Sequence, residues 1–138
     1  MPGLFRYSRR VEFAETDMAG IVHFSMFFRY MEEAEHALWR AAGMTIATPG
    51  ETIGWPRVAA SFDFKAPLHF EDEFDVTVEI AGVARRTIEY GFTILLGSRT
   101  IGRGTMASAC VRKAPGEPMK SIDIPADVID RLRAVLAV

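Results

Sequence analysis

Two periodicities divide this chain into stretches with alternating hydrophobic and polar residues and one stretch with helical spacing. Residues 4–13 alternate, which predicts a half-buried strand. The side chains expected on its apolar face are Phe5, Tyr7, Val11 and Phe13. Residues 26–42 place apolar side chains three and four positions apart opposite a charged stripe, so we expect a long helix there, deep against a sheet. The flanking residues suit a helix start and a helix stop: Ser25 and Gly43.

The second half of the chain shows the two-residue period of β-strands almost throughout. Four runs are expected to be strands: residues 58–64, 74–80, 88–94 and 99–113. Gly97-Ser98 between the last two runs predicts a two-residue hairpin turn. Gly102 and Gly104 indicate a bend, or the close approach of another backbone.

Helical spacing returns after Pro125 and predicts a short terminal helix. One early helix followed by an antiparallel meander is an α+β arrangement in which the sheet wraps the helix. We expect one domain over residues 1–138.

Composition narrows the class of protein. With 138 residues, 49% of them hydrophobic, the chain can bury one core. A formal net charge of −2 argues against an electrostatically driven nucleic-acid binder. No run approaches the ~18–20 apolar residues that span a bilayer, and no secretion signal is recognisable. We expect a soluble cytoplasmic protein without a membrane span.

Cysteine, histidine and glycine patterns indicate neither a metal site nor a nucleotide fold. Cys110 is the only cysteine, so no intramolecular disulfide can form, and its apolar surroundings indicate a reduced packing thiol. The three histidines lack the paired spacing of metal ligands. The glycines form neither GxGxxG nor a P-loop.

The segment that carries chemistry is residues 15–24, ETDMAGIVHF, directly before the expected helix. Asp17 follows a strand-like run and precedes a flexible turn at Gly20. A carboxylate held beside the free N–H groups of a helix N-terminus can act on a carbonyl, and the N–H groups can stabilise the resulting oxyanion. An aspartate before a glycine turn can also simply cap the turn. The pattern therefore indicates acyl transfer and leaves a purely structural role open.

The same segment, continued by the helix, resembles the signature of hotdog-fold acyl-CoA thioesterases, in the group of 4-hydroxybenzoyl-CoA thioesterase and the Tol–Pal-associated thioesterases. The stretch that carries the resemblance is Thr16-Asp17-Met-Ala-Gly20-Ile-Val22, continuing through Phe27, Arg29-Tyr30 and Glu32. The stretch Phe62-Asp-Phe-Lys-Ala-Pro67, followed by Asp72, resembles the next block of the family. The resemblance covers roughly residues 8–113 and implies a five-stranded antiparallel sheet around a central helix.

This resemblance implies hydrolysis of an acyl- or aryl-CoA thioester to a free acid and CoA. No cofactor is implied, because the coenzyme A thioester is the substrate. The expected assembly is a homodimer, or a dimer of dimers (a homotetramer), with active sites at the dimer interface. An acyl carrier protein is a further candidate partner.

Individual positions match the family's site. Asp17 matches the catalytic aspartate, which serves as nucleophile or general base. The backbone N–H of Phe24 matches the donor that polarises the thioester carbonyl. The loop leading into the helix is matched by Gly20, Ile21, Val22 and His23.

Three positions depart from the family pattern. Phe24 stands where many members have His, and Met26 and Phe27 replace an Asn or Ser and a Tyr. These replacements favour a mechanism with one aspartate and backbone donors. They also support an alternative function, a non-catalytic acyl-CoA or acyl-carrier-protein binding module. A hotdog dehydratase or hydratase is a third option, although His23 does not fit the His–acid pairing of those enzymes.

Other charged residues are secondary candidates. Glu32 and Glu35 on the helix are fallback bases, with a salt bridge as their simpler role. His23 either orients substrate or packs against its neighbours. Basic residues near strand ends can bind the phosphates of CoA, and each can equally be a solvated surface residue: Lys65, Arg85, Arg86, Arg112 and Lys113.

Overall fold

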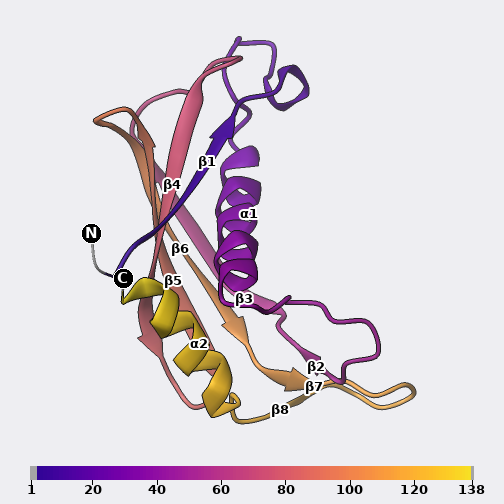
Figure 1. Cartoon of the computed structure of the whole chain (residues 1–138). Helices are drawn as coiled ribbons and strands as arrows, with labels where there is room; N and C mark the ends of the chain where they lie inside the picture. Colours follow the sequence, from indigo (N-terminus) through magenta and orange to yellow (C-terminus); the bar gives the residue numbers. More distant parts are fainter. Residues whose placement is uncertain (1–2, 138) are drawn as a thin grey trace.

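A computed structural model describes residues 3–137 and shows a five-stranded antiparallel sheet with a long helix, α1, across one face (Figure 1). The strand order is β1-β4-β5-β6-β3, so β1 and β3 form the two edges. The strands are β1 (Phe5–Arg10), β3 (Arg57–Phe64), β4 (Glu73–Val83), β5 (Thr87–Leu96) and β6 (Arg99–Ala109). The predicted α+β arrangement and five-stranded sheet are confirmed.

The helix α1 (Met26–Ala41) lies on the sheet through its apolar face, as predicted. The side chains that it buries there include Phe27, Tyr30, Met31, Ala34 and Leu38. Burying a large apolar side chain contributes about 1.5–3 kcal/mol, so this face holds the helix firmly. Gly43, with φ +78°, follows the end of the helix. Ser25 occupies the N-cap position, as predicted, but its side chain makes no capping hydrogen bond.

The first strand is shorter than predicted. It ends at Arg10, and Phe13–Glu15 form a 3-10 turn, η1. The chain leaves the sheet here because Val11 pairs with the loop before β4: its N–H donates to Asp72 O and its carbonyl accepts from Glu71 N–H. Val11 is buried as expected, whereas Phe13 is exposed, so the expectation that Phe13 faces the core is wrong.

The predicted hairpin between β5 and β6 is confirmed, with Gly97 at φ +61° and Leu96 opposite Arg99. The prediction of a close approach at Gly104 is also confirmed. A Cβ on Gly104 would lie 2.6 Å from Met31 Sδ and 2.6 Å from Ser61 O. This residue therefore lets β6 lie tightly between α1 and β3.

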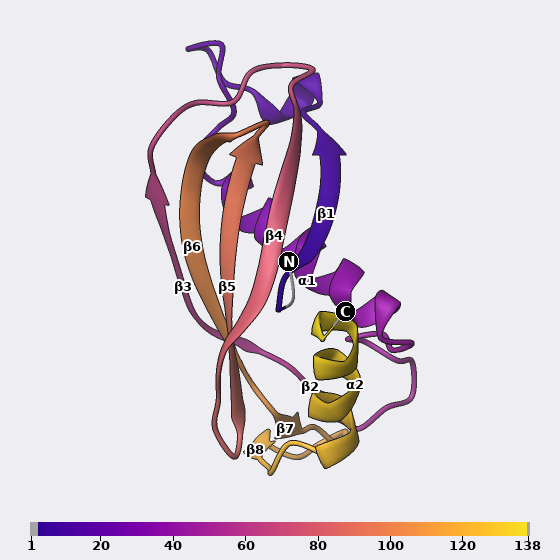
Figure 2. The ribbon, with the colours of Figure 1, turned by 60° about the vertical axis from the view of Figure 1, so that its left-hand side comes forward.

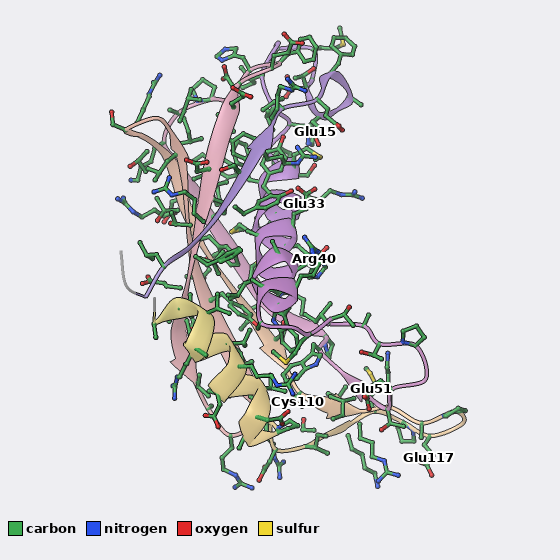
Figure 3. All side chains as sticks on the ribbon, in the orientation of Figure 1. Glu15, Glu33, Arg40, Glu51, Cys110 and Glu117 are labelled. Carbon is green, nitrogen blue, oxygen red and sulfur yellow. The ribbon has the colours of Figure 1, made fainter. Side chains whose placement is uncertain are left out.

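The last predicted strand, residues 99–113, is divided into two. After β6, the chain forms β7 (Val111–Arg112), which pairs with β2 (Ile53–Gly54) and β8 (Lys120–Ser121) in a small second sheet (Figure 2). Cys110 lies at the division with a free, buried thiol (Figure 3), and burial raises its pKa. The expected terminal helix is present as α2 (Ala126–Leu136).

No helix within residues 3–137 has the length and apolar character needed to cross a membrane.

Candidate functional site

Residues 16–22 form a narrow loop whose two ends lie side by side, above the start of α1 in Figure 1. Thr16 and Val22 form an antiparallel bridge, and Asp17 N–H donates to Ile21 O at 2.9 Å. Gly20 makes the reversal at φ +81°, a conformation that glycine adopts without a Cβ penalty. The loop therefore returns the chain to its starting point just before the helix begins.

Asp17 both caps this loop and lines an open hollow. Its Oδ1 accepts the N–H of Ala19 at 2.8 Å, so the turn-capping role considered from the sequence is present. Its Oδ2 receives no hydrogen bond from residues 3–137. The hollow beside it has a volume of about 540 Å³ and is mostly apolar, with a lining that includes Phe13, Met18, Gly20 and Phe70.

The segment leading into α1 leaves one backbone donor unused. Ser25 N–H donates to His23 Nδ1 and Met26 N–H to His23 O. Phe24 N–H has no acceptor within residues 3–137. The aligned peptide dipoles of the 16-residue helix add partial positive charge at this end. The Phe24 amide is therefore free to bind an anionic or carbonyl oxygen.

His23 presents a proton donor to solvent. Its Nδ1 accepts the Ser25 N–H at 3.2 Å and lies 2.8 Å from Ser25 Oγ. A ring nitrogen that accepts an N–H carries no proton, so in the neutral ring Nε2 carries it. The imidazole also stacks on the Phe24 ring, with centroids 4.6 Å apart. Both rings are exposed, so His23 is not a core residue. No Asp or Glu within residues 3–137 pairs with it.

Glu15, two positions before Asp17, is buried in a network that the sequence analysis missed. Arg9 donates to it through Nη1 at 2.6 Å and Nη2 at 2.5 Å, and Tyr30 OH donates at 2.9 Å. Burial alone would raise the pKa of Glu15, but these hydrogen bonds and one from Glu12 N–H lower it on balance. Arg9 lies on the same face of β1 as Phe5 and Tyr7. A charged residue on this apolar face was the sequence signal that could have indicated a buried partner.

The network continues along α1 (Figure 3). Arg9 Nε lies 2.7 Å from Glu33 Oε1, which also accepts a hydrogen bond from Tyr7 OH at 3.0 Å. Burial, together with Glu15, raises the pKa of Tyr30 well above its usual range. Tyr30 therefore stays protonated as a donor to Glu15.

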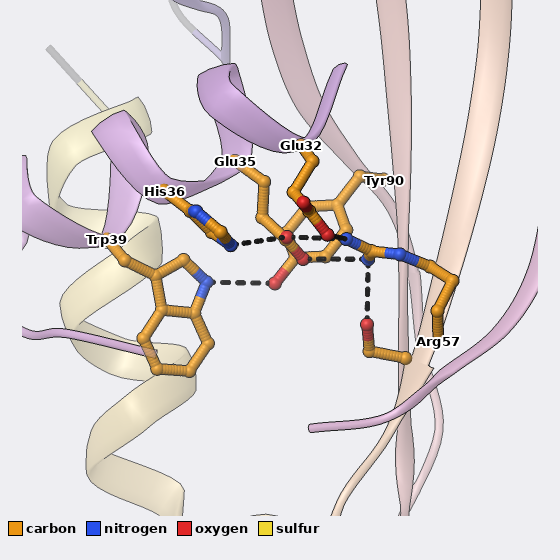
Figure 4. Close-up of polar contacts among 7 residues, drawn as sticks. Glu32, Glu35, His36, Trp39, Arg57 and Tyr90 are labelled. Carbon is orange, nitrogen blue, oxygen red and sulfur yellow. Dashed lines mark hydrogen bonds and ion pairs between the residues drawn. The ribbon is translucent and has the colours of Figure 1, made fainter. Parts of the chain in front are cut away.

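The fallback bases Glu32 and Glu35 both contact Arg57 of β3 (Figure 4). Glu35 is 0% exposed and accepts from Arg57 Nη1 at 3.0 Å and Nη2 at 2.8 Å. Arg57 also donates to Ser108 Oγ at 2.8 Å. A carboxylate enclosed in this way is a structural ion pair, the simpler role considered from the sequence.

The basic candidates for CoA binding are divided between the two ends of the sheet. Arg85 and Arg86 both pair with Asp123 beside the β4–β5 turn, at the end opposite the loop of Asp17 (Figure 2). Arg112 is in β7 and Lys113 follows it. Lys65 directly follows β3, at the end where Val22 N–H donates to Leu68 O. Within one chain, the structure brings only Lys65 to the end that holds Asp17.

Aromatic rings extend from the start of α1 to the open edge of the sheet. Phe27 stacks on Phe62 with centroids 5.0 Å apart, and Phe64 lies edge-on to both rings, at 5.5 Å and 4.9 Å. Phe64 is about half exposed on β3. The surface beside the helix N-terminus is therefore aromatic. Within residues 3–137, no group of three or more His, Cys, Asp and Glu residues lies close enough together to hold a metal ion.

Comparison with known proteins gives consistent similarities. The sequence profile of the Thioesterase-like superfamily matches residues 11–132. A protein of Aquifex aeolicus (strain VF5) is 30% identical over 131 residues, 94% of this chain and 98% of that protein. A 1,4-dihydroxy-2-naphthoyl-CoA hydrolase of Synechocystis sp. is 29% identical over 123 residues, 82% of this chain and 88% of the hydrolase. The solved structure of a gentisyl-coenzyme A thioesterase superposes with a TM-score of 0.83 at 27% identity, covering 93% and 99% of the two chains.

Proposed function

The chain belongs to the Thioesterase-like superfamily as a hotdog-fold hydrolase of acyl-CoA thioesters, and from this premise we propose that Asp17 and the Phe24 amide act together on an aromatic acyl group. The observation that carries the proposal is the pairing of residues 15–17 with residues 21–23. This pairing joins the loop of the aspartate to the start of α1, where the Phe24 N–H is unused.

The reaction begins when the Phe24 N–H donates a hydrogen bond to the thioester carbonyl oxygen. A preorganised donor at a helix N-terminus stabilises the negative charge that develops on this oxygen, and one such donor typically contributes 10²–10³ in rate. The second carboxylate oxygen of Asp17, which receives no hydrogen bond from the described residues, is the atom available for attack. The Ala19 N–H on Oδ1 holds the carboxylate in place.

Two routes lead from this arrangement to the same products. In the first, Asp17 Oδ2 bonds to the carbonyl carbon, the C–S bond breaks, CoA leaves as a thiolate, and water then hydrolyses the mixed anhydride. In the second, Asp17 takes a proton from a water molecule while the water oxygen bonds to the carbonyl carbon, and the C–S bond breaks. Both routes yield a free acid and CoA.

An aromatic substrate is supported by the surroundings of the loop and by the relatives. The Phe24 ring, just before the helix, and the Phe64 ring, which contacts Phe27 at the helix start, are both exposed. Offset or edge-on ring contacts favour aromatic partners by about 0.5–1.5 kcal/mol beyond burial. The two similar proteins with named substrates act on dihydroxynaphthoyl-CoA and gentisyl-CoA. This chain is proposed to act on the same chemical class.

A second copy of the chain would complete the site. The edge strand β3 exposes an uncharged row, Val58, Ala59, Ala60 and Ser61, and such an edge is a template for strand pairing. Antiparallel two-fold pairing of β3 would bring the Arg57 end of one copy to the Phe64 end of the other. The hollow that Lys113 lines beside Arg57 would then approach the loop of Asp17 of the other copy. Lys113 would supply a cation for the CoA phosphates.

The test is thiol release from a panel of benzoyl-, 4-hydroxybenzoyl-, gentisyl-, 1,4-dihydroxy-2-naphthoyl- and decanoyl-CoA. We expect turnover of aromatic thioesters and a loss of at least about 10²-fold in kcat for Asp17→Asn, with binding of a non-hydrolysable thioether analogue retained. Asp130→Asn, on the exposed side of α2, is the matched control and keeps wild-type kcat. An active Asp17→Asn variant would overturn the assignment of Asp17, and preference for decanoyl-CoA would overturn the aromatic class. Binding of the analogue without any thiol release would instead identify a non-catalytic acyl-CoA binding module.

Turnover in H₂¹⁸O identifies the first route through label in Asp17. Attack by Asp17, followed by water attack on the aspartyl carbon of the anhydride, places ¹⁸O in the Asp17 carboxylate and leaves the first product molecule unlabelled. Repeated turnover followed by peptide mass spectrometry detects any label in Asp17. General-base catalysis leaves Asp17 unlabelled throughout and labels every product molecule.

A further inference from the structure

The buried carboxylate of Glu15 has no part in the reaction described above, yet it lies at the base of the loop that holds the proposed reacting groups. We propose that Glu15, held by Arg9 and Tyr30, is a positioning residue that fixes Asp17 relative to the Phe24 amide. This proposal rests on the proposed function and adds to it the residue that sets the geometry of its site.

The Glu15 side chain is held from three elements at once. Arg9 of β1 donates two parallel hydrogen bonds, Glu12 N–H at the start of η1 donates to Oε1 at 2.9 Å, and Tyr30 of α1 donates to the same oxygen at 2.9 Å. The Arg9 guanidinium also lies 4.7 Å above the centre of the Tyr30 ring. With 7% exposure, the Glu15 side chain is enclosed, and its partners on the sheet edge and the helix jointly define its position.

The Glu15 backbone transmits this position to both ends of the loop. Its carbonyl accepts the N–H of His23 at 2.9 Å. Asp17 follows Glu15 by two residues, and Phe24 follows His23 by one. Asp17 and the Phe24 amide therefore lie within two residues of the Glu15–His23 backbone hydrogen bond. The acceptor of this bond, Glu15, is itself held in place through its side chain.

The charge of Glu15, in addition to its volume, is needed for this anchoring. A carboxylate offers only acceptors and satisfies all four donors that converge on it. A glutamine of nearly the same size would turn an NH₂ group toward at least one of these donors, and charge-assisted bidentate pairing with Arg9 would be lost. The core would stay filled while the loop lost its fixed position. A displacement of about 1 Å at a reacting group can cost about 10²-fold in rate.

The experiment measures kcat and analogue binding separately for Glu15→Gln and Tyr30→Phe. We expect Glu15→Gln to lower kcat by about 10–100-fold and Tyr30→Phe, which removes one donor, by about 3–10-fold. The Kd for a thioether analogue of the best substrate should change less than about threefold in both variants, because the substrate-contacting groups remain. Amide hydrogen exchange at His23 should quicken in both variants, while exchange in β5 stays unchanged.

Tyr90→Phe is the matched control. Tyr90 OH accepts the indole N–H of Trp39 at 3.0 Å, so its loss also removes a buried helix-to-sheet hydrogen bond, but at the far half of α1. All variants are assayed well below the lowest Tm. We expect Tyr90→Phe to lower Tm and leave kcat within about twofold of wild type.

Each outcome decides the proposal. Wild-type kcat in Glu15→Gln, or a fall in kcat that follows Tm equally across all three variants, overturns the positioning role. If Glu15→Gln does not fold, Tyr30→Phe decides by the same criteria. An inactive Asp17→Asn with a fully active Glu15→Gln would refute only the positioning role, whereas an active Asp17→Asn would refute the proposed function first.

Discussion

Arg57 of β3 holds Glu35 of α1 in a two-bond ion pair, with Nη1–Oε2 3.0 Å and Nη2–Oε1 2.8 Å (Figure 4). Glu35 is fully buried, and the Arg57 side chain keeps 22% exposure. The pair joins the central helix to the open edge of the sheet. The pair therefore links α1, the helix that follows the loop of Asp17, to β3, the strand proposed as the dimer contact.

Removing the charge of Glu35 should destabilise the protein strongly. Glu35→Gln leaves Arg57 without its buried partner, and such losses cost about 3 kcal/mol. Glu32 contacts the same guanidinium at 3.3 Å but is half exposed, so Glu32→Gln should cost less than about 1 kcal/mol. Urea unfolding of both variants at one protein concentration measures the difference. Equal costs for the two would show that the Glu35 pair has no special weight.

Acid should weaken the protein through Glu15. Its folded-state pKa lies below the ordinary value of about 4.3, so its ionised form stabilises the fold above that pH. This contribution is lost as the pH falls through the lowered folded-state pKa. We expect the difference in unfolding free energy between wild type and Glu15→Gln to stay constant near neutral pH and to shrink below about pH 4. A difference that is unchanged from pH 7 to pH 3 would contradict the pairing.

Gly104 should tolerate no side chain. A Cβ at this position would lie 2.6 Å from the Ser61 carbonyl oxygen, a backbone atom that cannot move alone. Gly104→Ala is therefore expected to cost about 1–3 kcal/mol through overpacking. Gly91→Ala in β5 is the control, because its Cβ would meet only the flexible Glu79 side chain, at 3.1 Å. Thermal unfolding should separate the two variants by several degrees, and similar Tm values would refute the close contact.

Gly20 should be required for its backbone conformation alone. A Cβ there would meet no atom within 4 Å, yet φ is +81°. Gly20→Ala should cost about 1 kcal/mol, and Gly20→Asn less, because Asn adopts left-handed conformations more readily. In thiol-release assays, Gly20→Ala should also lower kcat more than Gly20→Asn does. The reverse order would show that side-chain volume in the hollow governs this position.

Charges on the edge of β3 should prevent dimer formation. Val58→Lys combined with Ala60→Lys adds two cations to the exposed row, and lysine on an edge strand opposes pairing. Glu79→Lys, on the exposed face of β4, is the control for added charge. We expect sedimentation to show a dimer or a larger assembly for wild type and the control, and a monomer for the double variant. A wild-type monomer would refute the proposed pairing.

Much of the fold follows from local pattern. The helical spacing before Gly43 and the alternation through β4, β5 and β6 predict elements that the structure confirms. Each of these elements has one apolar face to bury, and its sequence period shows which residues form that face. The misplaced features lie where tertiary contacts overrule local pattern. By alternation, Phe13 should face the same side as Val11. The chain instead leaves the sheet between them, where Val11 pairs with the loop before β4. The division of the last strand at Cys110 likewise depends on pairing with β2 and β8.

The candidate site divides in the same way. The sequence alone identified Asp17, the turn at Gly20 and the helix start beyond it, because these lie within ten consecutive residues and match a family signature. It could not identify the anchoring of Glu15 by Arg9 and Tyr30, since those partners come from separate elements. A glutamate two positions before an aspartate is expected to be solvated until a sheet edge and a helix are seen to enclose it. Local sequence determines which groups can react, whereas long-range packing decides which charges are buried and hold those groups in place.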